Sequence, residues 1–210
     1  MLFARPPATV IDAEDALPGR DTPVSVPEAH HVHGRPITPP WPDGHAVLVV
    51  GMGCFWGAER IYWSLDGVWT TFVGYAGGHT PNPTYREVCT GRTGHAEIAG
   101  VVYDPEVVGL DTLLGAFWEQ HDPTQSMRQG NDVGTQYRSI LLTTSDEQVT
   151  AAAASRDRYQ ARLRDAGVTA PITTTIEPLG EVYWAEAEHQ QYLSKHPGGY
   201  CNHGFCQAAY

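Results

Sequence analysis

Apolar runs and amphipathic segments alternate along most of the chain, which predicts a fold built of strands and helices. Five runs are rich in β-branched and aromatic residues and are bounded by turn residues, as strands are: 46–50, 68–75, 95–103, 136–143 and 172–176. We predict that each of these runs forms a strand.

Four segments between or after these runs have the spacing or the end signals of helices. One follows the first strand at 58–63, and a second is predicted from Asp111, as its N-cap, to about Gln120. Ser145–Gln148 has the pattern of a capping box and begins a third helix to about Asp165, which Gly167 is placed to end. A short fourth helix is predicted at 183–193.

Strands and helices in this mixed order predict an α/β (α+β) two-layer sandwich, with a mixed sheet and flanking helices. We divide the chain into an irregular arm at 1–45, a main domain at 46–195 and a coil tail at 196–210, which we expect to be a flexible part of the same domain. The arm is proline-rich, and we expect about its first 15 residues to be mobile. Four of its apolar side chains are placed to lie against the globular surface: Val24, Val26, Val32 and Trp41.

The composition narrows the classes of protein to consider. With 13 basic against 24 acidic residues, the chain lacks the clustered Lys and Arg that bind nucleic acid or anionic membranes. No apolar run approaches the ~18 residues of a transmembrane helix, and residues 1–7 lack the features of a secretory signal. We therefore expect a cytoplasmic monomer that binds neither nucleic acid nor membrane.

Four cysteines are too few for a disulfide framework in this chain, so they favour catalytic or metal-binding roles. Cys54 has the most informative surroundings, because it lies where the first strand turns into a helix, with Gly53 before it and Gly57 after it. Unpaired N–H groups at a helix N-terminus favour a negative charge, so we expect this thiol to ionise below its usual pKa and to act as a nucleophile. The alternative is a buried structural cysteine.

Two further cysteines, Cys201 and Cys206, lie in the tail with His203 between them. These are three zinc-type ligands, whose fourth partner would have to be Cys54, Cys89 or His196. They also suit redox chemistry, in which mobile thiols resolve an oxidised cysteine and then form a disulfide with each other. The spacing leaves both interpretations open, and a nucleophilic Cys54 favours the redox one because it requires resolving thiols.

Four other polar residues are candidates for chemistry. Glu97 lies early in a strand among apolar neighbours, so an inward-facing carboxyl there would hold its proton near neutral pH and suit a reaction that expels oxygen. An outward-facing glutamate would have no such role. Tyr85 follows a turn, and Tyr137 lies in a segment that begins at Asn131-Asp132. Each tyrosine hydroxyl can enter a cleft or be satisfied in the core.

Other cysteine and histidine positions have simpler interpretations. Cys89 has no glycines around it and is predicted to be a small buried apolar residue. The arm histidines lack interleaved cysteines or acids, so we expect solvent-exposed loop residues rather than metal ligands: His30, His31, His33 and His45.

Several blocks, in this order, resemble the peptide methionine sulfoxide reductases of the A type. They are Gly53-Cys54-Phe55-Trp56-Gly57, Gly74-Tyr75-Ala76-Gly77-Gly78, Tyr85, Gly94-His95-Ala96-Glu97, Asn131-Asp132 to Tyr137-Arg138, and His189-Gln190-Gln191-Tyr192. The resemblance extends from about Leu17 to Cys206. It implies an α/β sandwich whose catalytic part is 46–195 and whose redox tail is 196–210. It also implies reduction of methionine S-sulfoxide without a metal or other cofactor, and thioredoxin as the reductant.

The resemblance also assigns roles to individual residues. Cys54 corresponds to the nucleophile, which becomes a sulfenic acid, and Glu97 to the proton donor. Tyr85 and Tyr137 correspond to the tyrosines that hold the sulfoxide oxygen, and Asp132 to an active-site acid. The remaining correspondences are Phe55 and Trp56 with the apolar pocket for the substrate methyl group, and Cys201 and Cys206 with the first and second recycling cysteines. The loop between those two is shorter than in the longer bacterial forms, which affects their exchange step.

Two other functions are consistent with single features of the sequence. Cysteine hydrolysis or acyl transfer would use Cys54, His189 and Asp132 as a triad and would not require the tail cysteines. A zinc-binding interaction module would use the tail, and stoichiometric zinc in the purified protein would identify it.

Overall fold

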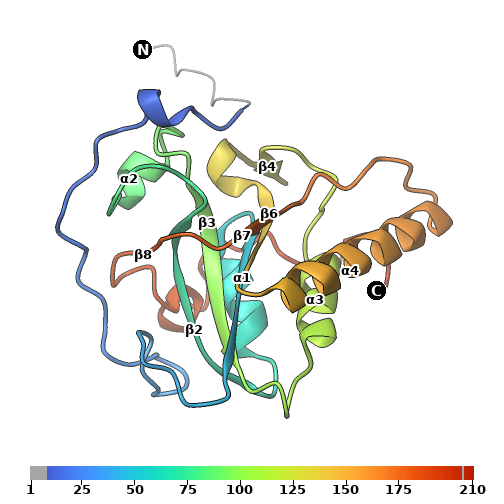
Figure 1. The fold of residues 1–210 in the computed structure, drawn as a ribbon, viewed down its shortest axis with the longest axis horizontal. Coiled ribbons are helices and arrows are strands. Elements are labelled where there is room, and N and C mark those ends of the chain that lie inside the picture. The colour runs from blue at the N-terminus through green and yellow to red at the C-terminus, as the bar shows by residue number, and fades with distance from the viewer. Residues whose placement is uncertain (1–8, 205) are drawn as a thin grey trace.

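A curled six-stranded sheet forms the centre of the molecule in the computed structural model, which describes residues 9–204 and 206–210 (Figure 1). The strand order is β7-β6-β1-β3-β2-β8, and only β6 and β7 pair in parallel. The strands are β1 (Ala46–Met52), β2 (Val68–Ala76), β3 (Ala96–Tyr103), β6 (Ser139–Thr143), β7 (Thr175–Pro178) and β8 (Val182–Trp184); β4 (Arg128–Gln129) and β5 (Asp132–Val133) form a separate pair. The predicted α/β fold with a mixed sheet is confirmed.

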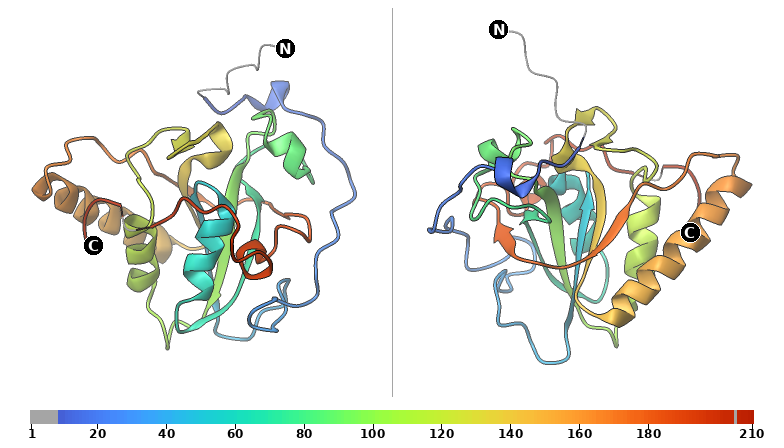
Figure 2. Two further views of the ribbon diagram at one scale, coloured as in Figure 1. Left: turned by 180° about the vertical axis from the view of Figure 1, so that it is seen from behind. Right: turned by 45° about the horizontal axis from the view of Figure 1, so that its top comes forward.

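Three helices cover one face of this sheet, as Figure 2 shows from behind. They are α1 (Phe55–Trp63), α3 (Leu110–Glu119) and α4 (Asp146–Asp165). Their apolar stripes bury large side chains such as Tyr62, Trp118 and Tyr159 against β1 and β3. The other helical turns are short: η1 (Ala13–Asp15), α2 (Tyr85–Val88), η2 (Thr135–Tyr137) and α5 (Tyr192–Lys195).

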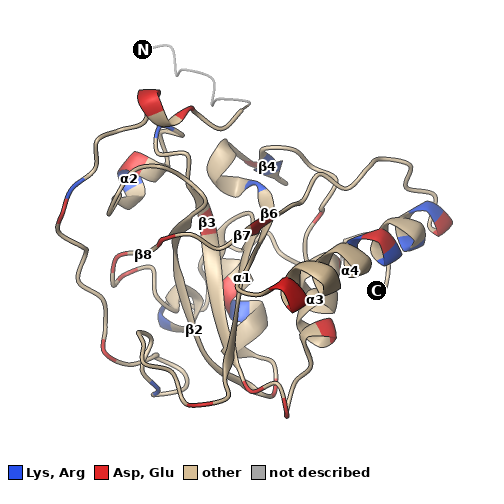
Figure 3. Cartoon of the chain, in the orientation of Figure 1, with Lys and Arg blue, Asp and Glu red and all other residues tan. Residues whose placement is uncertain are grey.

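The longest helix, α4, begins and ends where the sequence predicts. Ser145 accepts the N–H of Gln148, while the Gln148 side chain accepts from Thr144 N and donates to Val47 O on β1. The cap therefore also ties the helix to the sheet. Gly167, at φ +85°, follows the last turn. The exposed side of α4 carries charges of both signs (Figure 3), as a solvated helix face does.

The arm covers the opposite face of the sheet. Ile37 is fully buried there, and Val26 and Trp41 pack against the same cluster, with the Trp41 ring stacked on Phe72 at 6.2 Å. Val32 does not reach the sheet and is 47% exposed, so its predicted burial is wrong. Of the 15 residues expected to be mobile, residues 1–8 lie outside the described part of the chain.

His30 corrects the prediction of exposed arm histidines. Its ring is 1% exposed, with Nε2 2.8 Å from Thr71 Oγ1, and its Nδ1 accepts the N–H groups of Val32 and His33. The ring thus closes a tight turn of the arm onto β2. Burial, and then the charge of His33, lower the pKa of His30 to about 3.

Several predicted elements also change. The strands predicted at 136–143 and 172–176 start later, at Ser139 and Thr175, and residues 135–137 form the turn η2 instead. The segment 183–193 is not one helix, because Val182–Trp184 pairs with β2 as strand β8 and only Tyr192–Lys195 is helical. The aromatic and β-branched residues at its start favour the strand. Asp111 is not a cap: α3 begins after Gly109, and the Asp111 carboxylate instead accepts the hydroxyl of Tyr210. Among the described residues, no helix is long and apolar enough to cross a membrane.

Candidate active site

Cys54 lies at the N-cap of α1, directly after β1, and is 7% exposed. Gly53 makes this sharp turn possible: its φ is +92°, and a Cβ there would lie 2.5 Å from the Gln129 side chain. The strand, turn and helix expected around this thiol are all present.

The expected lowering of the Cys54 pKa is wrong for the resting protein. Burial raises the pKa of the thiol strongly, and the nearby carboxyls of Glu97 and Asp132 raise it further. The backbone N–H groups of Trp56 and Gly57 lower it, as a helix N-terminus should. Loss of solvent outweighs these two N–H groups, so the free thiol keeps its proton at neutral pH.

Glu97 faces inward from β3, the neighbour of β1 in the sheet. It is 1% exposed, and its Oε2 accepts the N–H of Phe55 at 3.0 Å, one residue after Cys54. Burial raises the pKa of this carboxyl to about 8, the Phe55 N–H opposes the rise, and Asp132 adds to it. The side chain is therefore a protonated acid near neutral pH.

Tyr85, Tyr137 and Asp132 converge on the same place from α2, η2 and β5. Burial, and then the charge of Glu97, raise the pKa of both tyrosine hydroxyls, and Tyr85 also lies within the field of Cys54. Burial raises the pKa of Asp132, which accepts from Tyr200 Oη at 3.2 Å and Asn202 Nδ2 at 2.9 Å.

Aromatic side chains surround this group. Phe55 is 1% exposed, and its ring stacks with that of Tyr85 at a centroid distance of 6.3 Å. The half-buried Trp56 stacks on the ring of Tyr192 at a centroid distance of 3.9 Å. Trp56 Nε1 donates to His189 Nδ1 at 3.2 Å. The arrangement offers a small apolar surface beside a thiol and an un-ionised acid, which suits a compact, weakly polar substrate group.

Residues 185–192, here called the wall segment, hold these aromatic rings in place. Gln190 pairs with both the N–H and the carbonyl of Val73, as a strand would. Glu186 accepts Tyr85 N–H at 2.8 Å and Tyr75 O–H at 2.9 Å. The carboxylate of Glu59, which is fully buried on α1, accepts hydrogen bonds from the backbone N–H and the side-chain Nε2 of Gln191 and from the hydroxyl of Thr71.

Neither Glu59 nor Glu186 is among the predicted site residues, although the position of Glu59 along its helix could have indicated that it is buried. Glu59 shares the i, i+4, i+7 positions of α1 with the buried Phe55 and Tyr62, so it falls on the apolar face of the helix. Glu186 is half-buried and follows β8 in an irregular segment, where no periodicity indicates that its carboxylate faces inward.

The tail crosses the N-terminal end of α1 and then runs to α3, as the left view of Figure 2 shows. Cys201 Sγ accepts from Arg60 at 3.1 Å, and His203 Nε2 bonds the Met52 carbonyl at 2.8 Å. Cys206 is exposed at the end of α3, with its backbone N–H on Glu119 O. Three potential zinc ligands thus face three different partners. Across the described residues, no group of His, Cys, Asp and Glu is arranged to hold a metal ion.

Two further sequence interpretations are not matched by the geometry. In the described residues, the polar partner of the His189 ring is Trp56 and the partners of Asp132 are Tyr200 and Asn202, so the His–Asp contact of a triad is missing. Cys89 is exposed rather than buried, because its short α2 turn lies at the surface.

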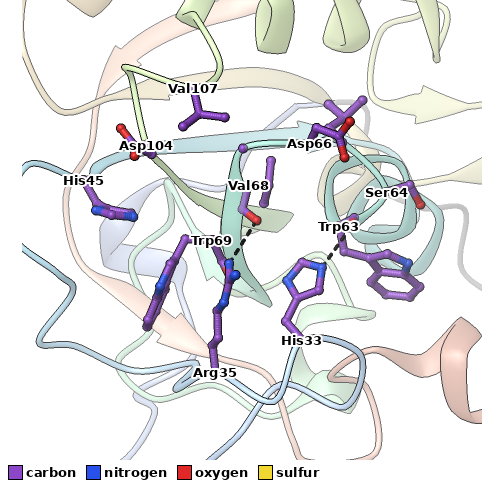
Figure 4. Close-up of a pocket in the computed structure, with 12 residues that line it drawn as sticks. His33, Arg35, His45, Trp63, Ser64, Asp66, Val68, Trp69, Asp104 and Val107 are labelled. Carbon is purple, nitrogen blue, oxygen red and sulfur yellow. Dashed lines mark hydrogen bonds between the residues drawn. The ribbon is translucent and has the colours of Figure 1, made fainter.

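A separate hollow of about 460 Å³ lies at the opposite end of α1 (Figure 4). Trp63, Trp69, His33 and Arg35 line it, and Arg35 donates to the carbonyls of Val68 and Trp69. None of the sequence-predicted site residues lines this hollow.

Comparison with known proteins identifies the family to which this chain belongs. The family model described as peptide methionine sulfoxide reductase matches residues 46–209. The chain belongs to the peptide methionine sulfoxide reductase family. It is 60% identical over 206 residues to the peptide methionine sulfoxide reductase MsrA of Salinispora tropica, covering 97% of this chain and 93% of that protein. The A-type reductase predicted from the sequence is confirmed, and the protein is an oxidoreductase.

Solved structures of other reductases of the family share the fold. Methionine sulfoxide reductase A of Corynebacterium diphtheriae is 45% identical, with a TM-score of 0.83 over 96% of this chain and all of that one. Mxr1 from Saccharomyces cerevisiae in complex with Trx2 is 26% identical, with a TM-score of 0.52 over 82% of this chain and 94% of that one.

Proposed function

We propose that this reductase converts methionine S-sulfoxide, in oxidised proteins or as the free amino acid, to methionine through a sulfenic acid on Cys54. The observation that supports this proposal best is the un-ionised Glu97 carboxyl, hydrogen-bonded to the residue that follows the buried thiol. A sulfoxide is reduced only if its oxygen is protonated as a nucleophile reaches sulfur, and this pair supplies both groups.

Substrate binding uses the aromatic surface. Phe55 and Trp56 contact the methyl group of the sulfoxide. Removal of this small apolar group from water favours its binding against the two rings. The sulfoxide oxygen points away from them toward Glu97 and the hydroxyls of Tyr85 and Tyr137. These donors stabilise the charge that develops on oxygen. Asp132 supports the proton donor from the side, because its charge adds to the rise in the pKa of Glu97.

The chemical step transfers oxygen from substrate to enzyme. Glu97 protonates the sulfoxide oxygen as Cys54 sulfur attacks the substrate sulfur, and the proton lost by the thiol returns to Glu97. The oxygen then moves from the substrate sulfur to the Cys54 sulfur: its bond to the methionine sulfur breaks, its bond to the Cys54 sulfur forms, and the transient S–S bond breaks. Methionine leaves, and Cys54 is left as a sulfenic acid. The N–H groups of Trp56 and Gly57 stabilise the sulfur anion as it forms.

Recycling uses the tail. Cys201 condenses with the sulfenic acid and releases water, and Cys206 then attacks the Cys54–Cys201 disulfide. The resulting Cys201–Cys206 disulfide is reduced by thioredoxin. The complex of the yeast relative with Trx2 supports a partner of this class.

The deciding experiment supplies separated S and R epimers of methionine sulfoxide with a small dithiol as reductant. Cys54→Ser should abolish reduction of the S epimer. In the oxidised wild-type enzyme, mass spectrometry of the peptides that contain Cys54, Cys201 and Cys206 should find the disulfides of the proposed relay. Wild-type rates in the serine variant, or preference for the R epimer, would contradict the proposal.

A second variant tests the recycling order. Cys206→Ser should retain turnover with the dithiol, which reduces the Cys54–Cys201 disulfide directly, and should slow turnover with thioredoxin. Equal slowing with both reductants, or with neither, would show that Cys206 has no place in the relay.

A further inference from the structure

The tail residues 201–203 rest on the first turns of α1, at a site shaped to receive them. A Cβ on Gly57 would lie 2.2 Å from His203 Nδ1 and 2.9 Å from Cys201 Sγ. The imidazole nitrogen and the thiol sulfur therefore converge on one point of the helix, within its first turn after Cys54. Only glycine at position 57 leaves this space free.

The hydrogen bonds of His203 fix its tautomer. Nε2 lies 2.8 Å from the Met52 carbonyl, which can only accept, so Nε2 carries the hydrogen. In the neutral ring Nδ1 is then an unprotonated acceptor. It is buried and has no hydrogen-bond partner among the residues that the structure describes. A buried hydrogen-bond acceptor without a partner destabilises the folded protein, so its presence next to a thiol calls for an explanation.

Arg60 completes the site from the next turn of α1. Its Nη2 donates to Cys201 Sγ at 3.1 Å, so a guanidinium contacts the same sulfur that lies with His203 Nδ1 beside Gly57. A cation at this position stabilises negative charge on sulfur.

We propose that His203 is the base that takes the thiol proton of Cys201 in the resolving step, and that Arg60 stabilises the sulfur anion. The proposal rests on the sulfenic acid of the proposed function. Cys201 sulfur attacks Cys54 sulfur, the S–S bond forms and the S–O bond breaks. The departing hydroxide receives the proton from His203 and leaves as water, so Cys54-SOH and Cys201-SH yield a disulfide and one water.

The groups around His203 keep its ring unprotonated in the resting enzyme. Burial, together with the charge of Arg60, lowers its pKa to about 4, against the opposing bond to Met52. The other titratable ring that senses its charge, His121 beyond the end of α3, is itself buried, with a pKa lowered to about 3. His203 is therefore neutral throughout the neutral range, and the anion of Cys201 balances its charge once it is protonated.

A single-turnover experiment tests this role. Reduced enzyme is mixed with one equivalent of methionine S-sulfoxide, and methionine release and disulfide formation are followed separately by rapid quench. His203→Gln preserves a bond to Met52 but supplies no base, so disulfide formation at pH 7 should slow by roughly 10²-fold. Arg60→Gln should slow the same step by about tenfold. Methionine release should be unchanged in both variants.

The pH dependence separates a base from a merely structural residue. In the wild type the rate of disulfide formation should be flat from about pH 5 to 8. In His203→Gln it should rise about tenfold per pH unit, up to the range near 8.5 where a cysteine ionises unaided. His45→Gln and Arg156→Gln change side chains that hydrogen-bond to Asp43 and Asp157 and not to residues 201–203, so these variants should behave as the wild type.

Two outcomes would be distinct failures. Disulfide formation at the wild-type rate in His203→Gln, or a flat pH profile in that variant, would overturn the role of His203. Absence of methionine release in the wild-type enzyme itself would instead reject the chemistry at Cys54.

Discussion

Burial acts on Cys54 and Glu97 in the same direction, and this keeps both side chains uncharged in the resting site. The thiol and the carboxylic acid both keep their protons near pH 7, because neither has enough solvent or counter-charge to ionise. In the proposed mechanism, the thiolate is therefore required only when the substrate oxygen takes the proton of Glu97.

Glu97→Gln should remove the proton donor while retaining the shape of the side chain and an acceptor for Phe55 N–H. The first-turnover rate of sulfoxide reduction should fall by roughly 10²- to 10⁴-fold. In the wild type the rate should also decline as pH rises past about 8, because the carboxyl then loses the proton it donates. A stopped-flow pH profile that keeps this decline in Glu97→Gln would contradict the assignment.

We expect Glu186 to affect the reaction by holding Tyr85 in position. Glu186→Ala leaves the Tyr85 N–H and Tyr75 O–H donors without their acceptor, which costs about 1–3 kcal/mol and should lower kcat/KM about tenfold or more. Glu186→Gln can still accept from Tyr85 N and can donate to the Tyr75 oxygen, so it should remain within a few-fold of wild type. The exposed Glu188→Ala is the matched control. Equal kcat/KM values for the Ala and Gln variants would show that these hydrogen bonds do not set the rate.

At the scale of elements, two irregular segments take positions in the fold that helices or strands commonly occupy. The arm forms a layer on one face of the sheet, and the wall segment pairs with β2 through the amide of Gln190 rather than through a strand. Such segments lack periodicity, so apolar patterning locates the sheet and three main helices but not these two layers.

Ile37→Ala should show that the arm belongs to the folded core. The side chain is fully buried on the sheet, and its loss should lower the free energy of unfolding by about 2–5 kcal/mol. Val32→Ala, in the same arm but 47% exposed, should change it by less than about 0.5 kcal/mol. Urea denaturation measures both variants, and equal effects would mean that the arm contributes no core packing.

The sequence predicts more of the site than of its supports. Cys54 is marked by its glycines and by its place between a strand and a helix, whereas Glu97 and the tyrosines are assigned through the resemblance to the family, because their local patterns also fit other roles. The wrong expectations share a physical cause: the pKa of Cys54, the exposure of His30 and the helix at 183–193 all depend on what a distant segment packs against. Local patterns contain no information on such long-range burial.

At the scale of the whole molecule, the buried carboxyls should make stability depend on pH. Glu97 and Glu59 have folded-state pKa values raised to about 8 and about 7, chiefly by burial, whereas both ionise near 4.3 when unfolded. Between these values the folded protein binds more protons than the unfolded one. The free energy of unfolding should therefore fall as pH rises, by at most about 1.4 kcal/mol per pH unit for each carboxyl.

Buried histidines act in a lower window. His30, His121 and His203 have pKa values lowered to about 3, 3 and 4, so the unfolded chain binds more protons than the folded one below about pH 6.5. Between about pH 4.3 and 6.5 these three histidines oppose the two carboxyls, and because they are the larger number, stability should fall slightly as pH drops through this window. Above 6.5 only the carboxyl effect remains, and Glu59→Gln should reduce the slope of urea-derived stability between pH 6.5 and 8. An unchanged slope would contradict the raised pKa of Glu59.

The wall segment lies more than 130 residues after Cys54 in the chain, yet the rings beside Cys54 depend on it. On the ribosome, β1 and the start of α1 emerge long before residues 185–192 are made. A growing chain therefore carries Cys54 before it has the segments to which the proposed function assigns substrate binding and recycling. We expect activity only after the wall segment and residues 201–206 have been translated, so a chain that stops before them has the cysteine but not the rest of the site.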